Sequence, residues 1–389
     1  MLASEPARGF PPAEYQSRVH AAQRQMEAAK LDGILLLSEP ELLYFTGFQT
    51  LFWQSPTRPW FLFLPAQGDP IAIIPEIGAA LMRQTGLRDI RTWSAPNPAD
   101  DGISLLQDLL GPLAARKAQI GLLKGPETGL RMPLGDFDRL VQSLPGLKIA
   151  DATPIIRGLR MVKSPAEIAK LAHICAIGSA SFDAVPGFAT PGQPLSTVFR
   201  DFRREALLLG ADDVPYLVGG ADQGGYIDVI SPPSGRELQR GDILMLDTGS
   251  RFDGYFCDFD RNFAIGHADD LSRRAYDVLH RAVEAGLEAA RPGATCRTVF
   301  AAMGKVIATM DQSGGDVGRA GHGLGLQLTE WPSFAGFDDT VLEENMVLTL
   351  EPSLSYGEGR MMVHEENIVI TPSGPRLLSK RAAAELPVI

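Results

Sequence analysis

The sequence has few cysteines, fewer basic than acidic residues and no long apolar run. Three isolated cysteines in 389 residues, with no C-x-x-C pair, exclude a disulfide framework and a thiolate zinc site. Lys and Arg number 36 against 47 Asp and Glu, and the net charge of −11 argues against nucleic acid or an anionic membrane as a partner. Without a run of ~18 apolar residues or an apolar leader, we expect a cytoplasmic protein.

The chain is longer than one hydrophobic core accommodates, because such cores stop growing near ~250–300 residues. A linker is predicted near Arg157–Lys163, because the next residues, Ser164-Pro165-Ala166-Glu167, match a capping box with proline in the first helical turn. We therefore expect an N-terminal domain at residues 1–157 and a C-terminal domain at residues 158–389.

The first half alternates predicted helices and strands. Helical spacing of apolar residues between Pro12 and Lys30 is followed by a short apolar run, Gly33–Leu37, which is typical of a buried strand and is expected to end at Ser38-Glu39-Pro40. Further strands are predicted at Phe61–Leu64, Ile71–Ile74, Ile90–Trp93, Ile120–Leu123 and Leu147–Ala150, and helices near 77–86, 101–115 and 134–143. This alternation predicts an α/β domain whose sheet is covered by helices on at least one face.

The segment Leu51–Phe61 combines two tryptophans, Trp53 and Trp60, with an arginine and two prolines. One interpretation is a packed loop. The other is an aromatic lid or interface element in which Trp53 contacts substrate, since Trp and Arg anchor many binding surfaces.

The second half contains an internal repeat. Pro191-Gly192, followed after four residues by Thr197-Val198-Phe199, recurs 101 positions later as Pro292-Gly293 and Thr298-Val299-Phe300. Downstream, two apolar strands end on acids, and a further acid follows each of them at a similar offset. These acids are Asp247 and Asp258 in the first copy, and Glu351 and Glu365 in the second. Matches that recur in the same order predict two similar halves.

Turn residues then predict two acidic hairpins. Asp253-Gly254 is a turn signal, and a hairpin centred near residues 252–253 sets Asp247 opposite Asp258 at ~5 Å between Cβ atoms. Gly357-Glu358-Gly359 does the same for Glu351 and Glu365. Four buried carboxylates are unstable without cations, so a metal site is predicted.

His322 in Gly321-His322-Gly323-Leu324-Gly325 is the candidate imidazole ligand of this metal site. A phosphate-binding loop is disfavoured at this segment because no lysine follows.

These residues resemble the pita-bread metallopeptidases, which include methionine aminopeptidase, aminopeptidase P, prolidase and creatinase. The resemblance rests on the spacing of the acids, on His322 in Gly-His-Gly-x-Gly, and on Glu351 in Leu-Glu-Pro. Tyr44-Phe45-Thr46-Gly47-Phe48 is similar to the creatinase/prolidase N-terminal domain, which methionine aminopeptidase lacks. The resemblance implies an α+β pita-bread catalytic domain preceded by an α/β creatinase-type domain, and a homodimer.

The resemblance also implies the metal chemistry. Asp258 and Glu365 would bridge two divalent cations, with Asp247 completing one site and His322 and Glu351 the other. Oxygen-rich ligation with one imidazole suits Mn, Co, Fe or Zn, with Mn expected first. Two such cations activate a water and polarise a carbonyl, and Glu351 would act as general base.

The sequence departs from proline-specific relatives at three positions. Those relatives carry histidines where this chain has Ile230 and Thr329, and an arginine where it has Val363. Relatives that act as dimethylsulfoniopropionate lyases carry an acidic ligand where this chain has Gly249. The substrate apparatus therefore differs from the usual one, since losing one such donor commonly costs ~10²–10³ in rate.

Nearby polar residues are the candidates to replace the two histidines and the arginine. Thr329 and Asp260 are candidates for catalysis, and Asp260 shares the face of Asp258 as a supporting residue, an extra ligand or an amine anchor. The candidate substrate-binding residues are Tyr226, Asp228, Glu330 and Trp53. Each of the loop residues has an alternative interpretation as an ordinary polar loop residue.

Three functions are compared. The first is a dinuclear-metal hydrolase cleaving an amide bond of a small or short-peptide substrate, nearest in pattern to Xaa-Pro aminopeptidases and dipeptidases. The second keeps the metals but acts on a compact metabolite, like creatinase or ectoine hydrolase, or as a lyase. The third is a metal-free binding protein that retains the fold.

Overall fold

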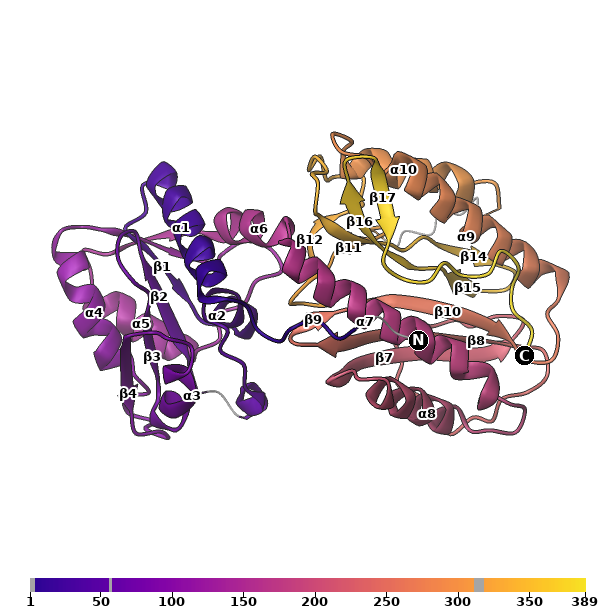
Figure 1. Ribbon diagram of the computed structural model, residues 1–389, viewed down its shortest axis with the longest axis horizontal. Coiled ribbons are helices and arrows are strands. Elements are labelled where there is room, and N and C mark those ends of the chain that lie inside the picture. Colours follow the sequence, from indigo (N-terminus) through magenta and orange to yellow (C-terminus); the bar gives the residue numbers. More distant parts are fainter. Residues whose placement is uncertain (1–3, 56–57, 311–317) are drawn as a thin grey trace. The chain divides into compact units, whose positions relative to one another are not determined.

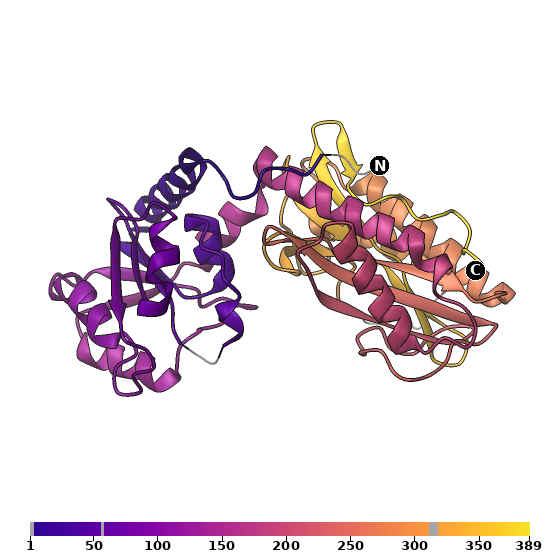
Figure 2. The same cartoon turned by 60° about the horizontal axis from the view of Figure 1, so that its bottom comes forward.

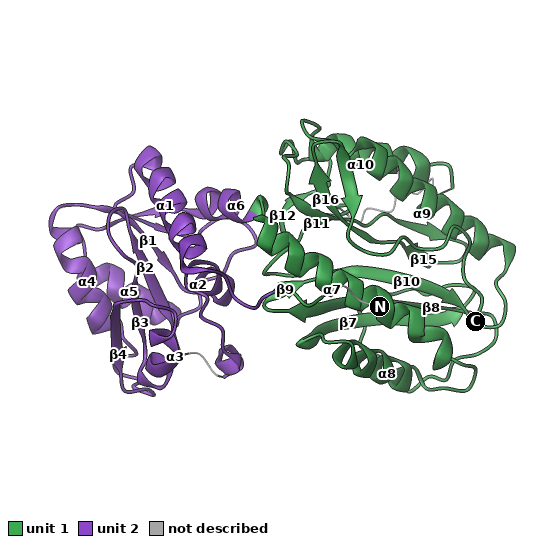
Figure 3. Cartoon of the chain, in the orientation of Figure 1, with its two compact units in different colours: residues 1–6, 161–389 green, residues 7–160 purple. Residues whose placement is uncertain are grey.

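The computed structural model describes residues 4–55, 58–310 and 318–389. Contacts divide the chain into two compact units, shown in different colours in Figure 3. The N-terminal unit comprises residues 7–160, and the C-terminal unit comprises residues 161–389 with the N-terminal segment before Ala7.

A six-stranded mixed sheet forms the centre of the N-terminal unit, in the order β4-β3-β2-β1-β5-β6. The pairs β1–β2 and β2–β3 are antiparallel, whereas β3–β4, β1–β5 and β5–β6 are parallel. The strands are β1 Gly33–Leu36, β2 Phe61–Pro65, β3 Ile71–Pro75, β4 Asp89–Trp93, β5 Gln119–Leu122 and β6 Lys148–Asp151; the helices are α1 Pro12–Ala29, α2 Glu39–Thr46, α3 Ala79–Arg83, α4 Ile103–Ala115, α5 Leu134–Ser143 and α6 Thr153–Met161, with 3-10 turns η1 Leu51–Gln54 and η2 Glu76–Gly78. All six predicted strands are present.

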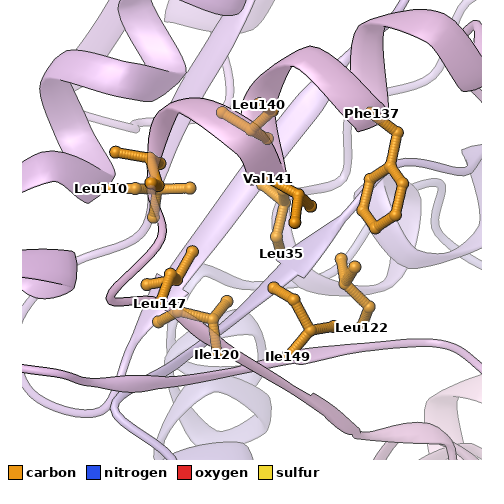
Figure 4. Close-up of a pocket in the computed structure, with 10 residues that line it drawn as sticks. Leu35, Leu110, Ile120, Leu122, Phe137, Leu140, Val141, Leu147 and Ile149 are labelled. Carbon is orange, nitrogen blue, oxygen red and sulfur yellow. The ribbon is translucent and has the colours of Figure 1, made fainter.

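Helices α4 and α5 cover one face of this sheet, because their apolar residues share a core with alternate residues of the strands, such as Leu35 and Phe63. A cavity of about 20 Å³ lies between α5 and the sheet and is lined only by aliphatic and aromatic side chains (Figure 4). A space of one water's size without polar partners does not hold an ordered water. The cavity is therefore a packing gap.

β1 ends before Ser38-Glu39-Pro40, as predicted. A helix follows at once, because α2 begins at Glu39 and Ser38 is its N-terminal flanking residue. Proline is tolerated in the first turn of a helix, where its missing N–H has no partner to lose. The same three residues therefore end a strand and begin a helix.

Trp53 and Trp60 are buried inside the N-terminal unit. Their rings lie 5.7 Å apart, Trp60 also packs on Phe48, and the Arg131 guanidinium lies 4.7 Å from the centre of the Trp53 ring. This is the packing that the packed-loop interpretation predicts. Residues 56–57 of the same segment lie outside the described residues.

The C-terminal unit contains two sheets and a separate hairpin, with the orders β10-β8-β7, β12-β11-β13-β16-β17 and β14-β15. The strands are β7 Asp213–Gln223, β8 Asp242–Phe252, β9 Tyr255–Phe256, β10 Phe259–Ala264, β11 His322–Gly323, β12 Glu330–Ser333, β13 Val347–Leu350, β14 Ser353–Tyr356, β15 Arg360–Val363, β16 Glu366–Thr371 and β17 Gly374–Leu377; the helices are α7 Pro165–Ala184, α8 Leu195–Leu208, α9 Asp270–Ala289 and α10 Cys296–Ile307, with the 3-10 turn η3 Val185–Gly187. Helices α7 and α8 pack on the first sheet, and α9 and α10 pack on the second (Figures 1 and 2).

The internal repeat is visible in the backbone. Gly192 and Gly293 precede α8 and α10 with φ angles of +87° and +88°. The N–H of Gly192 donates to Leu238, and the N–H of Gly293 donates to Leu342. The same turn therefore lies between the two helices of each pair and is hydrogen-bonded to the segment that precedes β8 or β13, as the repeated sequence predicts.

Helix α7 begins with the predicted capping box. The Glu167 N–H donates to the Ser164 hydroxyl, and the Ser164 N–H donates to the Glu167 carboxylate. Among the described residues, one segment, Pro165–Gly187, could cross a membrane by length and composition, but 61% of its most apolar 18-residue window is buried inside the structure. It contains Glu167 and Lys170, whose buried side chains bond to Tyr255 and Asp253 around the first hairpin, as in a core helix.

Removing the cap should weaken the C-terminal unit. Ser164→Ala leaves a helical N–H without its acceptor, and we expect the free energy of unfolding to fall by ~0.5–2 kcal/mol in urea titrations. Ser164→Asp retains an acceptor oxygen and should restore most of that loss. An equal loss in both variants would contradict the role of the cap.

Candidate metal centre

The first acidic hairpin forms in a register that differs from the prediction. Asp247 on β8 lies opposite Asp260 on β10, and not opposite Asp258. The reason is the turn: Asp253 and Gly254 both have positive φ, +48° and +86°, and form a two-residue connection of the type I′ kind. This turn lies one residue further along the chain than predicted, so every opposed pair shifts by two. An even shift keeps the side chains on the same face, because they alternate with a period of two.

The second acidic hairpin has the predicted register. β13 pairs with β16 on one side of the two glutamates, and β14 pairs with β15 on the other side. Between these ladders the His364 N–H donates to the Pro352 carbonyl at 3.1 Å. Glu351 and Glu365 therefore face each other across the hairpin.

His322 presents one ring nitrogen to the acids. Its Nδ1 lies 2.8 Å from the Gly323 carbonyl oxygen, which can only accept, so Nδ1 carries the proton and Nε2 carries the lone pair. Nε2 lies 3.4 Å from a carboxylate oxygen of Asp258 and 3.6 Å from one of Glu351. This is the tautomer that a metal-binding imidazole requires.

Gly321 explains why the segment around His322 is rich in glycine. Its φ is +134°, and a Cβ there would lie 2.2 Å from the Thr349 carbonyl oxygen of β13. The His322 N–H donates to the Thr349 hydroxyl at 3.1 Å. Only glycine permits this close approach, which sets the imidazole against the second hairpin.

Asp258, His322 and Glu365 each offer a ligand atom, and these atoms lie within 4.8 Å of one another. All three side chains are buried. One carboxylate oxygen on each of Asp247, Asp260 and Glu365 is also enclosed without a hydrogen-bond partner. Native proteins rarely leave such oxygens unpaired, because the desolvation penalty is then uncompensated.

The electrostatics of the group call for a cation. Burial, followed by repulsion from neighbouring carboxylates, raises the pKa of Asp247, Asp258 and Glu365 well above the ordinary values. Two ligand atoms bound to one cation at ~2.0–2.2 Å lie ~3.0–3.6 Å from each other. The distances from His322 Nε2 to the carboxylate oxygens of Asp258 and Glu351, 3.4 and 3.6 Å, fall in this range. Carboxylates with one imidazole therefore fit a divalent metal.

Two residues near the acids were not predicted from the sequence. The Tyr216 hydroxyl donates to the Asp247 carboxylate, and burial with the surrounding acids raises the pKa of Tyr216. Tyr216 lies opposite Gly249, where a Cβ would lie 2.3 Å from Leu328 and 3.0 Å from Tyr216.

The second residue is Arg319, whose positive charge lowers the pKa of Asp258, although burial raises that pKa by more. Neither residue belongs to a recognisable motif, and only Arg319, three residues before His322, is close to one in sequence.

The backbones of the two central acids are braced by residues of the opposite hairpin. The Asp258 N–H donates to the Asn367 side-chain oxygen at 3.0 Å, and the Asn367 amide donates back to the Asp258 carbonyl. In return, Arg261 donates to the Glu365 carbonyl at 2.8 Å and to the Asp260 carbonyl. Each hairpin therefore holds the acid of the other.

Three of the predicted substrate-binding residues have structural roles. Tyr226 is 2% exposed, and its hydroxyl is hydrogen-bonded to the Asn262 side chain and to the Val363 N–H; that it contacts substrate stays a prediction. Glu330 is buried in an ion pair with Lys163 at 3.2 Å, and the prediction that it binds substrate likewise stays untested. The Asp228 carboxylate accepts from residues of its own loop, including the Ile230 N–H at 2.9 Å. The predictions for Thr329 and Trp53 remain untested.

Comparisons with known proteins agree with this geometry. Residues 169–372 match the model of metallopeptidase family M24, and residues 18–162 match the creatinase/prolidase N-terminal domain. The chain is similar to a probable dipeptidase PepE of Mycobacterium tuberculosis, 30% identical over 98% of this chain and 99% of the relative. It is 22% identical to an Xaa-Pro dipeptidase of Pyrococcus horikoshii over 91% of this chain and 94% of that protein.

A crystal structure of dipeptidase PepE from Mycobacterium ulcerans superposes with a TM-score of 0.82 at 29% identity, covering 98% of this chain and 99% of that one. The matched M24 region is more than half of the chain and contains both acidic hairpins and His322. Fold, buried acids and family model thus agree, and the chain belongs to metallopeptidase family M24, a family of metal-dependent hydrolases.

Proposed function

We propose that this protein is a dipeptidase that uses two divalent cations, with Mn²⁺ as the expected native metal. One observation supports this most directly. Buried carboxylates from both hairpins, Asp258 and Glu365, lie beside the His322 imidazole, and Asp247, Asp260 and Glu365 each enclose an oxygen without a hydrogen-bond partner. Such an arrangement is unfavourable without cations and favourable with them.

Each residue then has a role. Asp258 and Glu365, one from each hairpin, would be shared between the cations, with Asp247 on one side and His322 and Glu351 on the other. Bound divalent cations supply Lewis acidity, which favours deprotonation of water and polarises a carbonyl oxygen. The Glu351 side chain is 33% exposed, whereas Asp258 and His322 are below 7%. Glu351 is therefore the group that can meet substrate, take a proton from the nucleophile and return it to the leaving nitrogen.

A dipeptide is the proposed substrate because the relatives include proteins named dipeptidase and Xaa-Pro dipeptidase. A dipeptide ends in a carboxylate, which requires a cationic partner. Val363, which stands where proline-specific relatives have arginine, is apolar and buried. Arg319 is the cation whose charge reaches Asp258, and we assign it to the substrate carboxylate.

A second candidate function is hydrolysis of a compact metabolite by the same metal chemistry. Ile230 is 73% exposed and apolar, at a position where proline-specific relatives have a histidine donor. A substrate without a peptide's hydrogen-bonding groups would not need that donor.

We further propose that the protein is a cytoplasmic homodimer in which the segment around Trp53 closes over the partner's site. The 71% exposure of Leu51 supports a contact there.

Activity on dipeptides tests the proposal. With Mn²⁺ added, we expect turnover of Xaa-Pro and other dipeptides, measured by release of free amino acids. Glu351→Gln should reduce kcat by at least ~10²-fold, because the proton carrier is lost. Hydrolysis of a C–N bond in creatine or ectoine, with no turnover of any dipeptide, would favour the second candidate instead.

Metal removal should make stability depend on pH. The folded pKa values of the buried acids lie above the unfolded values of ~3.9 and ~4.3, so their contribution to stability is full below those values and is lost as pH rises. Cations cancel this loss. We therefore expect the increase in unfolding temperature on adding Mn²⁺ to be larger at about pH 8 than at about pH 5. An equal increase at both pH values would contradict the assignment.

Arg319 should act on substrate binding. Arg319→Met is expected to raise KM for dipeptides by ~10–100-fold, the value of a charge-assisted hydrogen bond, and to leave C-terminally amidated dipeptides unaffected. Arg297→Met, which removes a half-exposed arginine paired with Asp339, is the control. An equal effect on amidated and free dipeptides would argue against carboxylate recognition.

A further inference from the structure

Asp260 is an acid that the five-residue metal pattern does not include. It lies directly opposite Asp247 in the β8–β10 ladder, where Cβ atoms are ~4.5–5.5 Å apart. Its side chain is 2% exposed, and its Oδ1 has no hydrogen-bond partner. The facing Asp247 also has an enclosed Oδ1 without a partner.

The other oxygen of Asp260 is held by a closed network. The Asn262 amide donates to Asp260 Oδ2 and to the Val363 carbonyl, each at 2.7 Å. The Tyr226 hydroxyl accepts from the Val363 N–H and so must donate to the Asn262 side-chain oxygen, each at 2.9 Å. The orientation of the Asn262 amide is therefore determined, and the Asp260 carboxylate is fixed with Oδ1 left unpaired.

The nearest basic residue on the strand does not satisfy this oxygen. Arg261 donates to the backbone carbonyls of Asp260 and Glu365 and to the Glu366 carboxylate at 2.9 Å. Two facing, buried carboxylates with unpaired oxygens repel one another, and repulsion from Asp247 is the strongest of the charge effects on Asp260. A cation shared by the two unpaired oxygens removes both the repulsion and the unpaired acceptors.

We propose that Asp260 supplies a further oxygen ligand to the cation held by Asp247, and that Asn262 and Tyr226 position it. The inference rests on the proposed dinuclear site. It assigns to the buried Tyr226 a role behind the metal centre. It also explains why an acid at this position is anchored by only one of its oxygens.

Metal binding by the full-length protein tests the proposal. Metal-free protein is titrated with Mn²⁺ by calorimetry, and the Co²⁺-loaded protein is examined by visible absorption. Asp260→Asn should weaken one of two sites by at least ~10–100-fold and change the Co²⁺ bands, because coordination changes. The control is Asp242→Asn, which removes a buried acid at the start of β8 that is fully paired with Arg236 and Gln223; it should leave both readouts unchanged.

Asn262→Ala provides a second variant that keeps the Asp260 charge and frees its anchored oxygen. It should weaken the same site by a smaller factor and shift the Co²⁺ bands in the same direction. Unchanged Mn²⁺ affinity in Asp260→Asn would overturn the proposal. Weaker Mn²⁺ binding with unchanged Co²⁺ bands would overturn it too, because the Asp260 charge would then act on the cation from a distance without being its ligand. A wild-type protein that binds no metal would refute the proposed function itself, and this inference with it.

Discussion

The structure of the C-terminal unit depends on the electrostatic cost of enclosing several carboxylates together. Asp247, Asp258, Asp260 and Glu365 are raised in pKa by burial and mutual repulsion, and three of them keep an unpaired oxygen. Ionising such groups together in the interior is costly unless a cation is supplied. Metal binding, folding and catalysis are therefore coupled in this protein through the same oxygens.

The internal repeat provides the geometry that gathers these acids. Each half contributes a helix pair, a sheet and one acidic hairpin, and the turns at Gly192 and Gly293 have matching conformations. The halves are braced reciprocally, by Asn367 on the backbone of Asp258 and by Arg261 on that of Glu365. Because each brace crosses to the other hairpin, the separation of the two central acids is set by backbone contacts as well as by any bound ion.

The acids differ in their exposure to solvent, which suits them to different roles. Asp258, Glu365 and His322 are closed off from solvent, which favours strong ligation and a fixed geometry, whereas Glu351 retains contact with solvent. A group that exchanges protons with substrate needs such access. Near this centre, the charge of Arg319 reaches Asp258, and Val363 is apolar and buried.

The local sequence determined the elements and the identity of the acids. Periodicity predicts the strands of the N-terminal sheet, the repeat predicts two similar halves, and glycine-rich turns predict both hairpins, because these signals act over a few residues. The register of the first hairpin also follows from a local signal, since Asp253-Gly254 as the two central turn residues sets Asp260 opposite Asp247. Tertiary structure decided how the two hairpins brace one another, through Asn367 and Arg261. It also decided that Tyr216 approaches the acids and that Tyr226 is buried behind them, because these contacts join strands whose separation in the chain leaves no local signal.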